Sequence, residues 1–153
     1  MLERTLAWLA SEGIAVEHRV HAPGETSEAL AALRGEPLHH GVKALVMKIR
    51  GELTVLAVRS HERTDNSTVR RVLRSQKLRF ARREELEDHG LVPGRIPPFG
   101  RPLLPFRLVA DEGLRDYPVV AFTAGTNTDS LLISTQDWIR VAGPELYPLC
   151  MAR

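Results

Sequence analysis

The sequence predicts a mixed α/β (α+β) fold in which helices flank a sheet that is largely antiparallel or mixed. Three observations support this class. Segments with helical and with strand periodicity both occur, and consecutive strands joined by short turns outnumber strand–helix–strand units. Neither repeats nor a long linker interrupt the 153 residues. A chain of this length is most simply a single domain, residues 1–153, which buries roughly 70% of its unfolded surface.

Helices are predicted where apolar residues recur every three or four positions, or where a capping residue opens a short segment. The first helix has Leu2, Leu6 and Leu9 on one face and stops at Gly13. In chain order, the predicted helices are 2–12, 28–34 (Thr26 or Ser27 before it, Gly35 after it), 67–75 (Asp65 or Asn66 before it), 83–89 (Gly90 after it) and 136–142 (Ser134 or Thr135 before it, Gly143 after it).

Strands are predicted where apolar residues alternate or run together between turn residues. Residues 42–50 and 53–59 give the clearest pattern, and Gly51-Glu52 is the predicted hairpin turn. Because both strands are almost continuously apolar, we expect a sheet that is covered on both faces. In chain order, the predicted strands are 16–20, 42–50, 53–59, 78–81, 104–110, 119–123 and 131–134.

Composition indicates an ordinary globular protein, with 43% hydrophobic and 26% charged residues. No apolar run approaches the ~20 residues of a membrane span, and residues 1–4 lack the layout of a signal peptide. We therefore expect a cytoplasmic protein without a membrane partner. Cys150 is the single cysteine, which excludes an internal disulfide, and none of the six histidines has the spacing of a zinc site. No metal and no cofactor are expected.

Basic residues gather in one region although the net charge is only +2. The cluster comprises Arg70, Arg71, Arg74, Lys77, Arg79, Arg82 and Arg83. It can contact phosphates, or it can be an ordinary solvated helix face with its adjoining loop. Aromatic residues make up 5% of the chain, too few for an extended base-stacking platform. Together with the low net charge, this argues against a general nucleic-acid binder, and DNA is not an expected partner.

Lys43 stands in line with the apolar residues Leu45 and Met47 of a predicted strand. A lysine there either extends to solvent at the sheet edge or projects into a pocket as a fixed cation. Both interpretations stay open on this pattern alone.

The segment PGRIPPFG, residues 93–100, combines three prolines with two glycines. Proline fixes the backbone and restricts the preceding residue, whereas glycine permits positive φ or close approach of a ligand. The segment is therefore a stiff wall that presents a few backbone N–H and C=O groups, or a connector that turns a corner.

Sequence motifs exclude several enzyme classes. The chain has no P-loop, no G-x-G-x-x-G and no G-x-S-x-G. Nucleotide hydrolysis, dinucleotide redox chemistry and an α/β-hydrolase nucleophile are therefore not expected.

Three segments in this order, Lys43-Ala-Leu-Val, Gly94-Arg-Ile-Pro-Pro-Phe-Gly100 and Thr123-Ala-Gly125, resemble the YbaK/aminoacyl-tRNA deacylase family. This family includes free-standing trans-editing proteins and the editing insertion of bacterial prolyl-tRNA synthetases. Supporting matches are His21-Ala-Pro, Thr26-Ser-Glu28, Asp65 and Asp137-Trp-Ile-Arg140, and the resemblance extends from about residue 14 to 143. Some alanine-specific relatives carry a histidine-containing segment where this chain has Thr123-Ala-Gly125.

The resemblance implies a curved, mostly antiparallel or mixed sheet of about six to seven strands, and hydrolysis of the ester that joins a wrong amino acid to the 3′ end of a tRNA. It implies catalytic roles for Lys43, Gly94 and Thr123, with Lys43 holding the terminal phosphate or the ester region. The substrate-binding residues that it implies are His21, Thr26, Pro98, Gly100 and Gly125. The candidate tRNA contacts are Arg70, Arg71, Arg74 and Lys77.

The implied partners are the 3′ end of an aminoacyl-tRNA and, as a second candidate, an aminoacyl-tRNA synthetase. Alanine, cysteine, serine and threonine all stay open as the amino acid removed. The alternative function is a non-catalytic module that binds an amino acid or aminoacyl adenylate, or docks on a synthetase. Lys43 and the loop glycines favour the enzyme.

Overall fold

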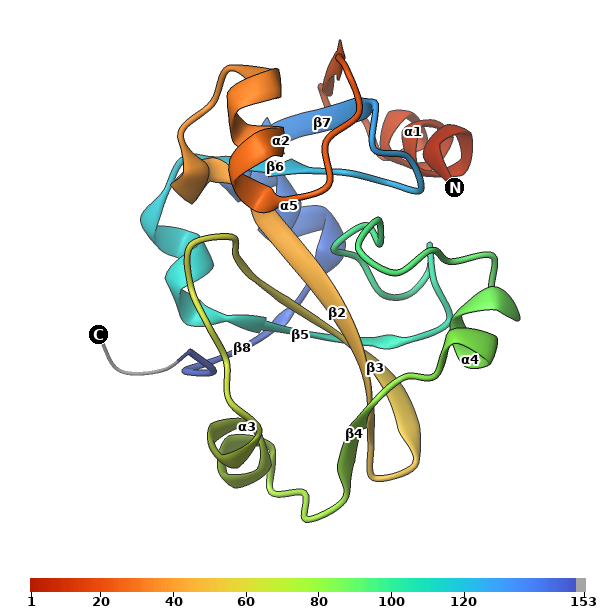
Figure 1. Cartoon of the computed structure of the whole chain (residues 1–153), viewed down its shortest axis with the longest axis vertical. Coiled ribbons are helices and arrows are strands. Elements are labelled where there is room, and N and C mark those ends of the chain that lie inside the picture. Colours follow the sequence, from red (N-terminus) through yellow and green to blue (C-terminus); the bar gives the residue numbers. More distant parts are fainter. Residues whose placement is uncertain (151–153) are drawn as a thin grey trace.

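The computed structural model describes residues 1–150 and contains helices and strands in a mixed order (Figure 1). The predicted α+β class is confirmed. In chain order the elements are α1 (Leu2–Ser11), β1 (Glu17–Val20), α2 (Ser27–Arg34), the 3₁₀ helix η1 (Leu38–His40), β2 (Val42–Ile49), β3 (Glu52–Arg59), α3 (Asn66–Leu73), β4 (Leu78–Phe80), α4 (Arg83–Glu87), β5 (Arg107–Asp111), the 3₁₀ helix η2 (Glu112–Asp116), β6 (Val119–Phe122), β7 (Asp129–Ser134), α5 (Thr135–Ala142) and β8 (Glu145–Tyr147).

The strands divide between two sheets instead of forming the one sheet of six to seven strands expected from the sequence. The larger sheet has the order β4-β2-β3-β5-β8 and the smaller one β1-β7-β6. Pairing is antiparallel except for β5, which runs parallel to β3 and β8, so the predicted mixed character is confirmed. The division arises because η2 carries the chain out of the larger sheet after β5, and β6 then pairs with β7. Strand β8, three residues long after Gly143-Pro144, was not predicted.

The hairpin of β2 and β3 is the longest paired unit and positions Lys43. Its turn is Arg50-Gly51, one residue earlier than predicted, because both residues adopt positive φ (54° and 77°) as a two-residue hairpin turn requires. Val42, Ala44 and Val46 face the main core, whereas Leu45 and Met47 belong to a second apolar cluster on the other face. The expected coverage of both faces is therefore present.

Arg59, at the end of β3, is a buried link between the two sheets. Its side chain is 0% exposed and donates hydrogen bonds to the backbone carbonyls of His40, Val119 and Tyr117. Because a buried cation needs acceptors, this set of carbonyls fixes how η1, η2 and the start of β6 meet the end of β3.

The segment 91–106 contains no helix or strand, yet much of it is buried. Phe99 is 0% exposed and packs edge-on against Trp8 and Phe122. Strand β5 begins at Arg107 and not at residue 104, because backbone hydrogen bonds from Leu104 to Gly100 and from Arg101 to Phe106 hold this part in a turn.

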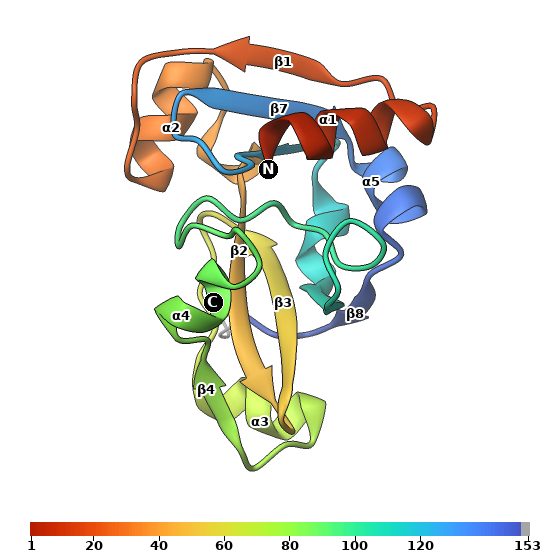
Figure 2. The ribbon, with the colours of Figure 1, turned by 90° about the vertical axis from the view of Figure 1, so that its right-hand side faces the viewer.

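The elements separate along the long axis of the molecule. In two views at right angles, α2, β1 and β7 lie at one end, and α3, β4 and the hairpin turn lie at the other (Figure 1, Figure 2). None of the helices formed by residues 1–150 is long and apolar enough to cross a membrane.

Candidate active site

A pocket of about 210 Å³ lies where α2, the start of β2, the 94–96 segment and the end of β6 meet. Four predicted site residues, each from a different part of the chain, line it: Thr26, Lys43, Gly94 and Thr123. Arg34 and Ile96, which were not predicted, line it as well. The structure thus gathers the three predicted catalytic residues around one cavity.

Lys43 is the second residue of β2 and is partly exposed. Lys43 is among the residues that line the pocket, which favours the second of its two possible placements, and its charge also acts on the Cys150 thiol. Its ammonium group makes no hydrogen bond or ion pair with any residue in the described range 1–150, whereas Lys48 on the same strand lies 3.5 Å from Glu85. An unpaired ammonium at a pocket wall is a donor that a negatively charged ligand can use.

The 94–100 segment offers backbone donors, but only some of them are free. The Arg95 N–H donates to the carbonyl of Val92, just before the segment, and the Phe99 N–H donates to the carbonyl of Pro97 within it. The N–H groups of Gly94 and Ile96 have no acceptor among residues 1–150, and both residues line the pocket. Gly94 has φ +80°, a conformation that glycine adopts without strain.

Thr26 and Thr123 differ in the use of their hydroxyl groups. Thr26 is the N-cap of α2, and its Oγ1 accepts a 3.0 Å hydrogen bond from the Ala29 N–H. Thr123 is 7% exposed and its hydroxyl has no partner within the part of the chain that the structure describes. Glu25 lines the pocket together with both threonines. Its carboxylate accepts hydrogen bonds from Asn127 (2.5 Å) and Arg95 (3.4 Å). A second hollow of about 140 Å³ shares Glu25, Gly94 and Thr123 with the pocket.

His21 does not line the pocket but bonds to a residue behind it. Its Nε2 lies 2.7 Å from the Ser130 Oγ, and its Nδ1 lies 2.8 Å from the Ala22 carbonyl oxygen. Ser130 is 0% exposed and accepts a 2.9 Å hydrogen bond from Arg34 Nε. His21 is therefore connected to the pocket wall through Ser130 and Arg34.

Three other predicted substrate-binding residues support the pocket from outside. Pro98 accepts a hydrogen bond from the indole N–H of Trp138, and Gly125 donates one of 2.7 Å to the Arg95 carbonyl. A Cβ added to Gly100 would lie 2.5 Å from the Phe106 carbonyl oxygen. None of the three is among the residues that line the pocket.

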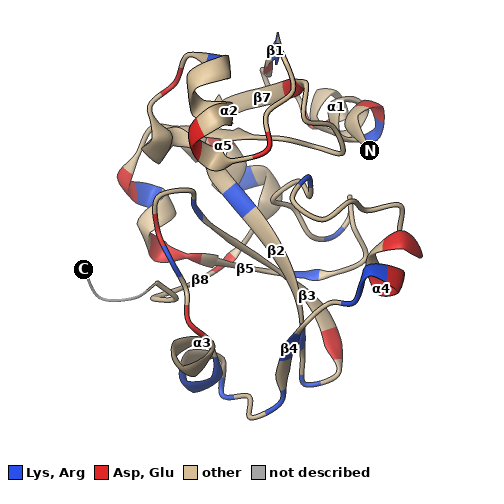
Figure 3. Cartoon of the chain, in the orientation of Figure 1, with Lys and Arg blue, Asp and Glu red and all other residues tan. Residues whose placement is uncertain are grey.

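The basic surface of Arg70, Arg71, Arg74 and Lys77 lies at the other end of the β2–β3 hairpin. Figure 3 shows Lys and Arg gathered on α3, the turn after it and β4. A hollow of about 530 Å³ there is lined by Lys48 and Lys77. Since strand residues rise ~3.3 Å each, Lys48 lies roughly 17 Å along β2 from Lys43.

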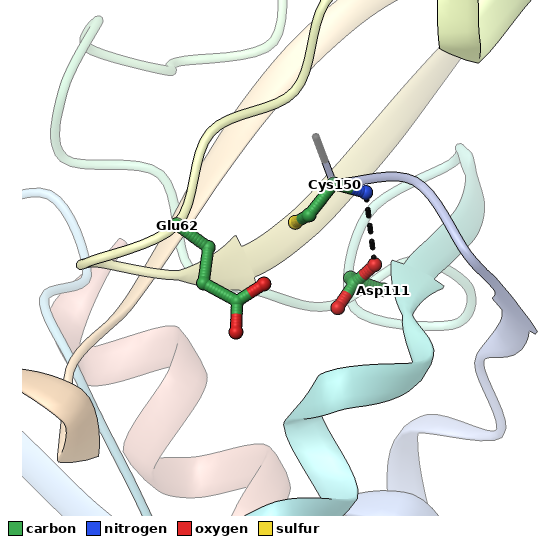
Figure 4. Close-up of side chains that lie close together, drawn as sticks. All are labelled: Glu62, Asp111 and Cys150. Carbon is green, nitrogen blue, oxygen red and sulfur yellow. Dashed lines mark hydrogen bonds between the residues drawn. The ribbon is translucent and has the colours of Figure 1, made fainter. Parts of the chain in front are cut away.

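Glu62, Asp111 and Cys150 form a set, among the residues described, whose candidate ligand atoms lie within 4.8 Å of one another (Figure 4). Asp111 Oδ1 accepts hydrogen bonds from the backbone of Leu149 and Cys150, and Oδ2 accepts one from Gly113. Burial and the Asp111 carboxylate raise the pKa of the Cys150 thiol to about 12. With its oxygens bonded to three backbone N–H groups, Asp111 anchors the segment after β8 to η2.

A lysine that makes no hydrogen bond or ion pair with residues 1–150 lies beside backbone N–H groups that have no acceptor in the same range, in a partly enclosed cavity. This arrangement suits a site that binds and activates a small polar group. The sequence profile of the aminoacyl-tRNA editing domain matches residues 21–141. The chain is 33% identical over 153 residues to the multifunctional Ser/Thr-tRNA deacylase ProXp-y of Escherichia coli (strain K12), covering 94% of this chain and 89% of that protein. It is 29% identical to part of the proline–tRNA ligase of Xanthomonas campestris pv. campestris (strain 8004), covering 80% of this chain and 22% of the ligase.

A solved structure has a similar fold. A candidate trans-editing enzyme for prolyl-tRNA synthetase superposes with a TM-score of 0.83 at 24% identity, over 98% of this chain and 96% of that one. The chain belongs to the aminoacyl-tRNA editing domain family. The resemblance carried by Lys43-Ala-Leu-Val, the 94–100 loop and Thr123-Ala-Gly125 is thereby confirmed, and so is the class of activity expected from it, deacylation of aminoacyl-tRNA.

Proposed function

We propose that this chain hydrolyses the ester of tRNA that carries serine or threonine, as a free-standing editing enzyme. The observation that carries the proposal is the meeting of Lys43, Gly94 and Thr123 around one pocket. The similarity to a Ser/Thr-tRNA deacylase over 94% of the chain supports these two amino acids out of the four that the sequence left open. The family match over residues 21–141 supports a single editing domain spanning residues 1–153.

In the proposed mechanism the protein positions a water molecule and stabilises charge, without a covalent intermediate. The aminoacyl ester is already activated, so an oriented water is a sufficient nucleophile. The free N–H groups of Gly94 and Ile96 are the candidate donors to the oxyanion that forms at the ester carbonyl. Lys43 holds the terminal phosphate or the ester region as a point charge, and the neighbouring ribose hydroxyl of the substrate assists in activating the water.

A separate editing enzyme has a physical rationale. A synthetase pocket distinguishes amino acids that differ by one methylene by only ~1–3 kcal/mol, and it rejects an isostere with an added hydroxyl weakly. Wrongly attached serine or threonine therefore has to be removed at a second site. This role belongs to the cytoplasm, where tRNA is charged and used, and it makes a synthetase a natural partner.

The basic surface is the proposed contact for the tRNA backbone. Lys77 and Arg71 are exposed. Lys48, which lines the same hollow as Lys77, lies roughly 17 Å along β2 from Lys43. A tRNA whose 3′ end enters the pocket can reach this surface with the phosphates of its acceptor stem. Binding through so few cations should be weak and sensitive to salt.

The proposal is tested by incubating the protein with one tRNA acylated with serine, threonine, alanine or cysteine, and measuring loss of the acyl group. We expect faster release of serine and threonine than in buffer alone. Saturable binding of aminoacyl-tRNA without release of any amino acid would instead support the non-catalytic binding module and contradict the proposal.

A further inference from the structure

Arg34 is a buried cation in the wall of the pocket that the sequence did not single out. It is the last residue of α2, directly before Gly35, which ends the helix in the left-handed conformation. Its side chain is 6% exposed and lines the pocket. Two of its nitrogens are bonded within the protein: Nε donates to Ser130 Oγ (2.9 Å) and Nη1 to the Ala121 carbonyl (3.4 Å). Its Nη2 has no acceptor in residues 1–150, so its N–H groups are available to a ligand.

The chain of hydrogen bonds behind Arg34 fixes its orientation. Arginine Nε–H can only donate, so Ser130 Oγ accepts from Arg34. Because the Ala22 carbonyl beside His21 Nδ1 can only accept, Nε2 of a neutral imidazole is the acceptor and the Ser130 hydroxyl donates to it over 2.7 Å. Neutral His21 then carries its hydrogen on Nδ1 and donates to the Ala22 carbonyl, 2.8 Å away. Each donor in this series of hydrogen bonds therefore has one acceptor. His21 and Ser130 are therefore positioning residues that act through Arg34.

Arg34 keeps its charge at neutral pH, since burial lowers the pKa of its guanidinium only to about 10. The carboxylate that lines the pocket, Glu25, is engaged by Asn127 and Arg95. The guanidinium is thus a strong donor inside the cavity, and a donor of this kind is costly to leave unsatisfied when a ligand displaces water.

The difference in exposure between Arg34 and Lys43 indicates which part of the substrate each one contacts. Arg34 is 6% exposed, whereas Lys43 is partly exposed. The aminoacyl group is the very end of the tRNA, so it enters first and reaches the buried part of the lining, to which Arg34 belongs, while the phosphates stay nearer the opening beside Lys43.

We propose that Arg34 is the specificity-determining residue of this site, donating a hydrogen bond to the side-chain hydroxyl of the seryl or threonyl group. Alanine is serine without its hydroxyl, and valine carries a methyl group in place of the threonine hydroxyl, so neither side chain offers the guanidinium an acceptor. A site built to bond a substrate hydroxyl rejects such analogues strongly. This inference rests on the proposed deacylase function and names how that function selects its substrate.

The test compares matched pairs of esters on one tRNA: serine against alanine, and threonine against valine. We expect wild type to prefer the hydroxyl member of each pair in kcat/KM. Arg34→Met should reduce each preference by roughly 10- to 100-fold, mainly by slowing release of serine and threonine. Arg34→Lys, which keeps the charge but not the planar fork, and Ser130→Ala, which removes the support of Arg34, should each reduce it less.

Because Arg34→Met can also weaken the end of α2, Arg19→Met is the matched control. Arg19 donates to the Arg34 carbonyl (2.6 Å) and to Glu36 (2.9 Å) but does not line the pocket. The Arg19→Met variant should be less stable than wild type but should keep both preferences, serine over alanine and threonine over valine. The inference would be overturned if the Arg34→Lys and Ser130→Ala variants both fold and both keep the wild-type preference for serine over alanine and for threonine over valine. Release of alanine and valine by the wild type as fast as serine and threonine would also overturn the inference, but it would not contradict the proposed deacylase function. A wild type that releases no amino acid would remove the proposed function itself.

Discussion

The indole N–H of Trp138 donates a 2.9 Å hydrogen bond to the carbonyl oxygen of Pro98, and both groups are buried. This bond joins α5 to the loop whose Gly94 and Ile96 line the pocket. Trp138→Phe would leave a buried carbonyl unsatisfied, which typically costs ~1–3 kcal/mol. We expect urea unfolding to show this decrease in the free energy of unfolding. Deacylation should also be slower, because the loop loses its support.

Trp8 provides a matched control for that bond. Its indole nitrogen is buried without a hydrogen-bond partner among the residues described. Trp8→Phe removes a similar volume and no hydrogen bond, so it should cost less stability than Trp138→Phe. Equal losses for the two variants would show that the bond to Pro98 contributes nothing.

Replacing Gly94 by alanine should mainly reduce activity, whereas replacing Gly100 by alanine should mainly reduce stability. At Gly94 the φ of +80° disfavours alanine by roughly 1–2 kcal/mol, but an added Cβ meets no atom within 4 Å. At Gly100 the Cβ would lie 2.5 Å from the Phe106 carbonyl oxygen. We expect Gly100→Ala to lower the thermal midpoint more, and Gly94→Ala to lose more activity per folded molecule. A Gly100→Ala protein as stable as wild type would contradict this assignment.

Glu85 should make stability depend on acid pH. Its hydrogen bonds with the Arg79 side chain and the Arg82 backbone N–H lower its pKa from 4.5 to about 2. Because the folded-state pKa is depressed, the stabilisation is present above about pH 4.5 and is lost as the pH falls towards 2. In urea unfolding, Glu85→Gln should therefore be less stable than wild type at pH 7, and the difference should shrink towards pH 2. A difference that is independent of pH would be inconsistent with this ion pair.

The basic surface should affect binding and not the chemical step. Arg71 and Lys77 are exposed and make no hydrogen bond or ion pair within residues 1–150. Arg71→Ala/Lys77→Ala should raise KM with little change in kcat and lower the slope of log affinity against log salt by about 2. Arg115→Ala, an exposed arginine on η2, is the control. If the double variant behaves like the control, tRNA does not use this surface.

Local sequence patterns drew attention to Lys43 and to the 93–100 segment but left two interpretations open for each, and the family resemblance supplied their expected roles. Lys43 stands out because a lysine interrupts an apolar strand, and the 93–100 segment stands out because it contains three prolines and two glycines. The five α-helices and seven of the eight strands formed by residues 1–150 likewise follow from local periodicity and caps, whereas the 3₁₀ helices η1 and η2 were not predicted. These patterns depend only on neighbours along the chain.

Long-range contacts explain what the sequence could not show. Arg34 looks like the ordinary basic end of a surface helix, and its partner Ser130 lies 96 positions away, within a strand. The division into two sheets likewise depends on where η2 sends the chain after β5. No local pattern encodes either relationship.

The central claim is that Lys43 acts on the substrate and not on the fold. Lys43→Ala should lower kcat/KM for deacylation of seryl-tRNA by at least ~100-fold, while its urea unfolding matches wild type because Lys43 makes no hydrogen bond or ion pair within residues 1–150. Arg115→Ala changes an exposed arginine on η2 that does not line the pocket; it is the control and should keep its activity. A folded Lys43→Ala protein that releases serine at the wild-type rate would contradict the account.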